Sequence, residues 1–375
     1  MRTTASYDLF PDARSERALA RARWLAREGR FSDAQSAYDE LLASKPELKA
    51  CWAEYFELLR AGGRGDAALQ LADRARAVFG DTGFSLTLRG AALTELGRYP
   101  EALAELDKAV EADPDFALVW HELGYAAWKL GDRNRALLAL DRAFALEPHT
   151  DTLKLRGQVL REAGRYQAAE VAFEGAAEAA EHAEQRADAE REIQVTRRYG
   201  SFAPRRPEDL SAGERWFADT GAVVLAGTPG PVAPSDETLV ATFAEVAARC
   251  DWHFGQVILL GPEFPATIDL AERLGAPVVT PGAFDPRVCP LVLALRPMYA
   301  DRTWNGLVAK LGGDATGLVF AVEHPAETQP VVTTDVAGVL TEGGKRLERA
   351  PHPAQAQSEA SHASARLAGR RLRPL

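Results

Sequence analysis

The hexapeptide Gly29-Arg-Phe-Ser-Asp-Ala34 decides the fold of the first half of this chain, because its pattern returns four more times. The later copies begin at Gly63, Gly97, Gly131 and Gly164. The alanines that close the five copies, Ala34, Ala68, Ala102, Ala136 and Ala169, are spaced 34, 34, 34 and 33 residues apart. A fixed period of this size is typical of a solenoid of helical hairpins.

Two runs of apolar residues at helical spacing make up each repeat, one on either side of the glycine. In the third repeat Leu86 and Leu93 mark the first helix, and Leu106 and Ala109 mark the second. Gly97 lies between them, where glycine adopts the left-handed conformation without a steric penalty and lets the chain reverse. Prolines that prevent the second helix from continuing are Pro46, Pro114 and Pro148.

These repeats resemble the tetratricopeptide repeat family. The fourth repeat fills the family's large, small and hairpin positions with Trp120, Leu123, Gly124, Gly131, Ala136, Leu140, Ala143 and Pro148. The resemblance covers residues 15–183 and implies an α solenoid of five helical hairpins, in which these positions are scaffold. We expect residues 1–14 to be a lead-in and residues 184–199 to form a capping or linker helix, because a terminal repeat needs a polar cover.

The resemblance also implies that the repeats bind a partner peptide in a concave groove lined by the first helices. The candidate groove residues are Arg23, Arg27, Arg60, His121, Tyr125, Trp128, Lys129, Lys154 and Arg161. His121, Tyr125 and Trp128 share one helix face, which favours an aromatic anchor site. The alternative is that Tyr125 and Trp128 pack against the neighbouring repeat as core. The excess of cations among these positions favours a partner with acidic residues.

The composition changes near Tyr199–Pro207, where glycine and prolines break the helical pattern. Residues 200–350 then alternate short apolar runs with helical patterns, which predicts an α/β domain with a mostly parallel sheet in Rossmann-like layers. The predicted strands are 222–226, 256–260, 277–280, 291–295, 318–322 and 331–333. The predicted helices are 236–250, 266–274 and 302–311. Residues 351–375 are predicted to be a disordered basic tail.

Ligands of open α/β sheets bind beyond the carboxyl ends of the strands. The polar residues expected there are Glu263, Thr280, Arg296, Glu323, His324 and Asp335. The domain has no glycine-rich phosphate-binding motif and no histidine pair at metal-ligand spacing. We therefore expect no catalytic residues, no metal and no cofactor, and we leave the ligand of this possible pocket unassigned.

A second resemblance lies within residues 250–345. Gln256–Glu263 and Ile268–Val279 are similar to the strand–helix–strand opening of a phosphoribosyltransferase, which implies a phosphate-cradling loop at Val331–Gly344. That loop normally begins with two adjacent acids, whereas this chain has only Asp335, and Glu342 would repel a phosphate. The resemblance thus implies a related fold from which the chemistry has been lost.

Composition narrows the class of partner and the compartment. The net charge of −10 argues against nucleic acid or an acidic membrane surface as a partner. No segment has the apolar length of a membrane span, residues 1–12 lack a signal-peptide core, and the three cysteines have no paired spacing. We expect a cytoplasmic protein, and the Ala-, Arg- and Gly-rich composition favours a bacterial source.

The prediction from the sequence is a non-enzymatic adaptor or scaffold whose repeats bind a partner. One alternative is an enzyme, a degenerate phosphoribosyltransferase-like or other small-molecule transferase, which the repeats dock. In the other alternative, the α/β domain is only a rigid platform or a dimerisation unit. An enzyme would need a deep polar pocket with convergent side chains at the strand ends.

Overall fold

The computed structural model describes residues 12–225, 235–283, 285, 288–296, 317–325, 335–342 and 345–346. The chain divides into two compact units between Ile193 and Gln194, inside helix α11 (Ala183–Gly200). We keep the sequence-based limits of 15–183, 184–199 and 200–350 as a proposal. The predicted helix at 302–311, the predicted strand at 331–333, the predicted tail and most of the predicted lead-in lie outside the described residues.

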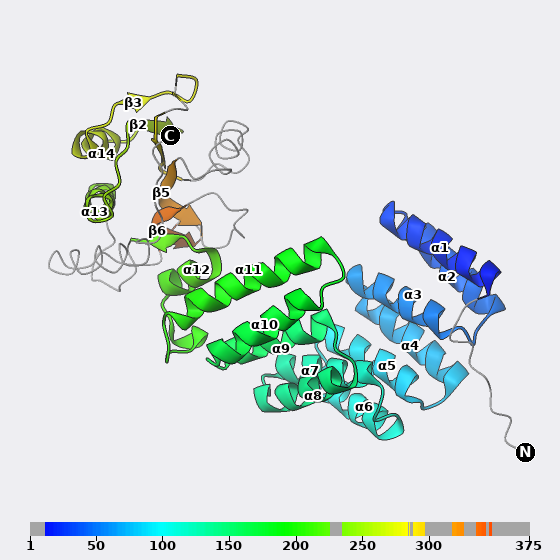
Figure 1. The fold of residues 1–375 in the computed structure, drawn as a ribbon. Coiled ribbons are helices and arrows are strands. Elements are labelled where there is room, and N and C mark those ends of the chain that lie inside the picture. Colours follow the sequence, from blue (N-terminus) through cyan, green and yellow to red (C-terminus); the bar gives the residue numbers. More distant parts are fainter. Residues whose placement is uncertain are drawn as a thin grey trace, which may run out of the picture. The chain divides into compact units, whose positions relative to one another are not determined.

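The N-terminal unit is a tandem stack of helical hairpins (Figure 1). The hairpins pair α1 (Ala13–Arg27) with α2 (Phe31–Ser44), α3 (Lys49–Ala61) with α4 (Gly65–Phe79), α5 (Gly83–Glu95) with α6 (Tyr99–Ala112), α7 (Ala117–Leu130) with α8 (Arg133–Leu146), and α9 (Thr150–Glu162) with α10 (Tyr166–Glu178). The predicted α solenoid of five hairpins is confirmed.

Each copy of the hexapeptide forms the turn of its hairpin. The glycine has a positive φ in all five copies, from 65° at Gly63 to 90° at Gly131. The closing alanine is fully buried in all five. The left-handed backbone conformation explains why glycine recurs, and close packing of the second helix explains why alanine recurs.

In the later hairpins a glycine of the first helix lies directly against a side chain of the second helix. A Cβ atom added to Gly90 would lie 2.5 Å from Cγ of Leu106, and one added to Gly157 would lie 2.7 Å from Cζ of Phe173. Leu106 and Phe173 are themselves fully buried. These positions accept only glycine without movement of the core.

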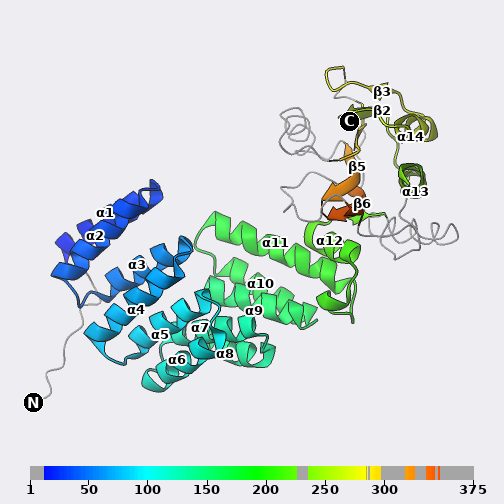
Figure 2. The same ribbon diagram turned by 180° about the vertical axis from the view of Figure 1, so that it is seen from behind.

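Helix α11 packs on the last hairpin, beside α9 and α10 (Figures 1 and 2). Its Ala189 joins a cluster with Leu153 of α9, and its Ile193 joins another with Leu160 and Phe173. This contact is the packing expected of a helix that covers the end of a repeat array.

The C-terminal unit contains one sheet with the strand order β1-β6-β5-β4-β2-β3, all parallel, and β7 pairs antiparallel with β6. The strands are β1 (Val223–Val224), β2 (Gln256–Leu260), β3 (Val278–Val279), β4 (Pro290–Ala294), β5 (Leu318–Pro325), β6 (Val336–Glu342) and β7 (Lys345–Arg346). The helices are η1 (Pro207–Asp209), α12 (Ala212–Thr220), α13 (Asp236–Arg249) and α14 (Ala266–Leu274). The predicted mostly parallel sheet is confirmed.

The core of this unit lies against the apolar central strands. Every residue of β4 is buried, as its continuous apolar sequence predicts. The ring of Phe243 on α13 stacks on that of Phe320 on β5, with 4.3 Å between the ring centroids. The helix and the strand are thus joined by buried aromatic rings.

Strand β6 corrects the prediction of a phosphate-cradling loop at 331–344. In the described part of that stretch, Val336–Glu342 is a strand that pairs with both β1 and β5. Asp335 therefore lies at the amino end of a strand, where its carboxylate accepts a hydrogen bond from the backbone N–H of Val319 at 2.7 Å. The prediction that Asp335 lines a pocket at the carboxyl edge of the sheet is wrong.

Candidate functional site

The first helices of successive hairpins contact one another in order: α3 with α5, α5 with α7, and α7 with α9. The outward-facing side chains of α1, α3, α5, α7 and α9 are called here the first-helix face. All nine predicted groove residues lie on these helices: Arg23 and Arg27 on α1, Arg60 on α3, His121, Tyr125, Trp128 and Lys129 on α7, and Lys154 and Arg161 on α9.

Tyr125 and Trp128 form an aromatic pair, with 5.9 Å between their ring centroids. The ammonium of Lys129 lies 4.6 Å from the Trp128 ring centroid and 5.2 Å from that of Tyr125. Trp128 Nε1 donates a hydrogen bond to Glu162 Oε2 at 2.8 Å. Both rings are partly buried against a core cluster of the repeats. Part of each side chain therefore packs as core and part stays accessible.

His121 is held between two first helices. Its Nδ1 lies 3.0 Å from Oγ1 of Thr152 on α9. Burial lowers the pKa of His121, although the carboxylate of Glu122 opposes the shift. The neutral imidazole is thus a link between repeats and contributes no positive charge at neutral pH.

Most of the predicted cations are already paired with the protein's own carboxylates. The pairs between neighbouring helices are Arg23–Glu54 at 2.6 Å, Arg161–Glu192 at 2.5 Å, and Lys154–Asp188. Their partners lie 31 or 34 residues along the chain, which is about one repeat. Because these cations already pair with carboxylates of the protein, they give little reason to expect that they attract an acidic partner. Within the described part of the chain, Arg27 and Lys129 have no carboxylate partner.

Arg60 lies at the centre of a cluster of carboxylates from three helices. Its Nε is 2.8 Å from Glu95 Oε1 on α5, and its Nη1 is 2.9 Å from Glu122 Oε1 on α7 and 3.6 Å from Glu57 Oε1 on α3. Burial opposes the charge of Arg60, but Glu122, Glu57 and Glu95 outweigh it and raise the pKa of the guanidinium. We call these four residues the Arg60 cluster.

The surroundings of Glu57 raise the pKa of its carboxyl group. Loss of hydration raises its pKa, Arg60 opposes this shift, and repulsion from Glu122 and Glu95 adds to it. Its side chain is nevertheless 65% exposed. The Arg60 cluster is therefore open to solvent at Glu57.

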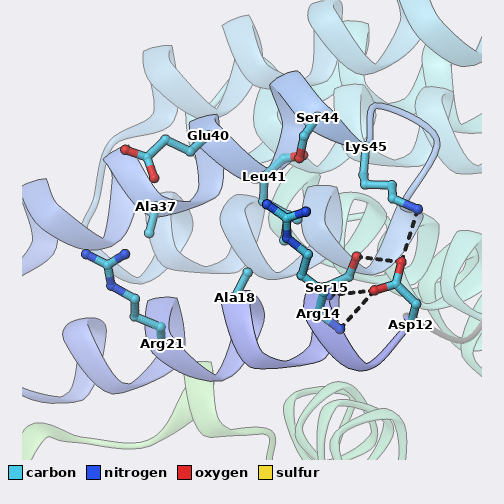
Figure 3. Close-up of a pocket in the computed structure, with 10 residues that line it drawn as sticks. All are labelled: Asp12, Arg14, Ser15, Ala18, Arg21, Ala37, Glu40, Leu41, Ser44 and Lys45. Atoms are coloured by element: carbon cyan, nitrogen blue, oxygen red, sulfur yellow. Dashed lines mark hydrogen bonds and ion pairs between the residues drawn. The ribbon is translucent and has the colours of Figure 1, made fainter.

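A cavity of about 460 Å³ lies elsewhere, between α1 and α2 of the first hairpin (Figure 3). At one end Asp12 accepts hydrogen bonds from the backbone N–H groups of Arg14 and Ser15 and pairs with Lys45 at 3.0 Å. Its other lining residues are Ala18, Arg21, Ala37, Glu40, Leu41 and Ser44. None of the predicted site residues lies in this cavity. Asp12 serves there as the N-cap of α1.

In the C-terminal unit, two of the predicted pocket residues come together. Arg296, beyond β4, donates from Nε to Oε2 of Glu323 on β5 at 2.5 Å, and Glu323 is buried. The next residue, His324, is fully buried, with its ring centroid 4.8 Å from that of Trp216 on α12. Burial lowers the pKa of His324. Successive residues of a strand point to opposite faces of the sheet, so Glu323 and His324 do not form an acid–base pair.

The remaining predicted pocket residues are Glu263, Thr280 and Asp335. Glu263 follows β2 and Thr280 follows β3, and neither is buried. Asp335 lies at the opposite ends of the strands, as its bond to Val319 shows. Asp335 is therefore separated from the other five residues, which follow or end strands at the carboxyl edge of the sheet.

Three further features concern metal binding, the cysteines and membrane-spanning helices. Among the described residues, no group of three or more His, Cys, Asp or Glu side chains is placed to hold a metal ion. Cys51, Cys250 and Cys289 form no disulfide, and burial raises the pKa of each thiol, that of Cys51 to about 12. In the part of the chain that the structure describes, no helix is both long and apolar enough to cross a bilayer.

Comparison with known proteins identifies the repeats. Residues 90–131 match the family model described as TPR repeat, and residues 121–199 match the one described as tetratricopeptide repeat. The Hsp70-Hsp90 organizing protein of Triticum aestivum is 42% identical over 66 residues, which are 18% of this chain and 11% of that relative. The chain thus spans about a tenth of the length of this relative.

Solved structures of repeat proteins are similar to part of the chain. A thermophilic TPR protein of Thermus thermophilus has 19% identity and a TM-score of 0.42, over 48% of this chain and 98% of its own. The type IV pilus biogenesis factor PilW has 21% identity and a TM-score of 0.39, over 50% and 91%. YrrB, a TPR protein with an unusual peptide-binding site, has 17% identity and a TM-score of 0.31, over 46% and 90%.

Proposed function

We propose, from the premise that this is a tetratricopeptide repeat protein, that it is an adaptor whose first-helix face binds a peptide segment of a protein partner. Tetratricopeptide repeats are protein-interaction modules, and the wheat relative is by its name an organizing protein for Hsp70 and Hsp90. The identity of the partner of this chain is left open.

The observation that carries this proposal is the aromatic pair of Tyr125 and Trp128. Both residues are partly exposed, and the hydrogen bond to Glu162 holds Trp128 in place. A side chain that is already fixed loses little conformational entropy when a partner binds. Aromatic anchors of this kind supply much of the affinity of protein interfaces. We propose that an apolar side chain of the partner packs against the two rings.

Charge contributes less to this proposal than the sequence suggested. Acidic residues of a partner would meet Arg27 and Lys129, whereas Arg23, Lys154 and Arg161 already pair with carboxylates. Exposed ion pairs contribute little to affinity in any case. We therefore propose that apolar contact, rather than attraction of acidic residues, supplies most of the binding energy.

Affinity capture with the full-length chain tests the proposal. The Tyr125→Ala/Trp128→Ala double variant is compared with Phe144→Ala, which removes a 39% exposed ring from the second helix α8. A partner that the wild type and Phe144→Ala capture, and the double variant loses, supports binding at the first-helix face. A partner captured equally by all three proteins would place the binding surface elsewhere.

The alternative of a transferase gains no support from the predicted pocket residues. Arg296 is used to neutralise Glu323, and His324 is buried against Trp216. We propose no reaction and no ligand for the C-terminal unit. We keep the cytoplasm as the proposed location, since cysteines that form no disulfide suit a reducing compartment, and cell fractionation would test it.

A further inference from the structure

The Arg60 cluster on the first-helix face has more negative charge than the described cations neutralise. Three carboxylates, those of Glu57, Glu95 and Glu122, share the single guanidinium of Arg60. The other nearby cation, Lys129, lies over the rings of Tyr125 and Trp128 and not in an ion pair with the described carboxylates. The cluster thus has a net negative charge, although the sequence predicted an excess of cations on these helices.

Glu122 gives a second observation, independent of the count of charges. Its side chain is only 5% exposed, and its Oε2 accepts no hydrogen bond from any described residue. An unsatisfied buried acceptor is costly, and more so for a charged group. Arg60 donates to Oε1 of Glu122 and also pairs with two other carboxylates. Oε2 of Glu122 therefore lacks a hydrogen-bond donor among the described residues.

We propose, resting on the proposed function, that the Arg60 cluster binds a lysine or arginine side chain of the partner peptide. Such a cation would enter beside Glu57, whose side chain is the most exposed of the three acids. It would donate to Glu122 Oε2 once the side chains that cover this buried atom in the free protein move aside. The carboxylates supply the attraction, and a charge-assisted hydrogen bond is among the stronger kinds.

The ring of Tyr125, beside the cluster, is already in contact with two cations of the protein. The guanidinium carbon of Arg60 lies 5.6 Å from the centroid of this ring, and Nζ of Lys129 lies 5.2 Å from it. Aromatic faces attract cations within about 6 Å. Because Glu122, Tyr125 and Trp128 are on one helix, the partner would present a basic residue close to the apolar residue that packs on Trp128.

Two pools of fluorescent decapeptides test this proposal by fluorescence anisotropy with the full-length chain. Both pools have leucine fixed at one central position and randomised flanks, and the adjacent position is fixed as arginine in one pool and glutamate in the other. We expect the arginine pool to bind at least about tenfold more tightly. Glu122→Gln and the less buried Glu95→Gln should each weaken the arginine pool about tenfold.

The matched control is Glu101→Gln. Glu101 is also a carboxylate paired with an arginine, Arg98 at 2.6 Å, but it lies on the second helix α6. This variant changes the net charge equally and should leave the affinity for the arginine pool unchanged. Arg60→Gln should bind the arginine pool at least as tightly as wild type, because it removes the internal competitor for the carboxylates.

The outcomes separate this inference from the proposed function. If the glutamate pool binds as well as the arginine pool, or Glu122→Gln and Glu95→Gln both behave like Glu101→Gln, the first-helix face binds peptides but the cation site is wrong. If neither pool binds the wild-type protein, peptide binding by this face fails together with the inference.

Discussion

Trp128 of α7 donates a hydrogen bond from Nε1 to Oε2 of Glu162 in α9, 2.8 Å away and 34 residues along the chain. Lys154 and Asp188 are joined across the same number of residues. Each of these polar contacts joins a first helix to the helix two further along the chain, with the period of the sequence repeat. The first-helix face is thus a structural seam as well as the proposed binding surface, so each binding variant needs a measurement of stability.

Substitution of two adjacent glycines tests the conformation assigned to the hairpin turn. Gly63 has a φ of 65°, whereas Gly62 has a φ of −83° and room for a Cβ atom 3.4 Å from the nearest neighbour. Gly63→Ala should destabilise the repeat unit by about 1–2 kcal/mol, because an L side chain is strained in the left-handed region. Gly62→Ala should have little effect. Urea unfolding curves of the two variants check this, and equal effects would contradict the assigned turn.

Lys154 is expected to contribute to stability rather than to partner binding, since it pairs with Asp188 of α11. Both side chains are partly buried, and a double-mutant cycle of Lys154→Ala and Asp188→Asn should give a coupling of roughly 0.2–1 kcal/mol in the free energy of unfolding. Partner affinity should change little in Lys154→Ala. A large loss of affinity without a coupling to Asp188 would restore Lys154 to the binding site.

The stability of the repeats should fall as the pH is lowered through the histidine range. Burial lowers the pKa of His121, so below the unfolded-state pKa the unfolded chain binds more protons than the native chain. The free energy of unfolding then decreases as the pH falls from roughly 7 to 5. His121→Gln should lose less stability than wild type over this range, measured by urea unfolding. The exposed His182 is the control position, and an unchanged pH dependence in His121→Gln would refute the role given to burial.

The repeat architecture could be predicted because its requirements are local. The positive φ at Gly97 favours glycine and the fully buried position of Ala102 favours alanine, and both residues recur in all five copies of the hexapeptide. The aromatic pair could also be placed on one helix face from spacing alone. The ion pair between Arg23 and Glu54 was missed because the two residues are far apart in sequence, although the repeat period could have indicated it.

The C-terminal unit was harder to predict because its interactions are between distant strands. Strand β6 contains Gly338, which looks like part of a loop. A Cβ atom there would lie 2.4 Å from the carbonyl oxygen of Val322, so the glycine is required by a neighbouring strand. Helix α12 was missed although Ser211 and Glu214 form its capping box, a signal that is visible in the sequence.

The affinity of Trp128→Ala for a captured partner, measured by titration calorimetry beside Phe144→Ala, tests the central claim most directly. Trp128 makes up half of the aromatic pair, whereas Phe144 lies on the second helix α8. The expected loss for Trp128→Ala is roughly 2 kcal/mol or more, about thirtyfold in Kd, while its helical circular dichroism is retained. Phe144→Ala should bind like the wild type. Equal affinities for the two variants, or unfolding of the repeats by Trp128→Ala, would show that this side chain is core and that the proposed binding face is wrong.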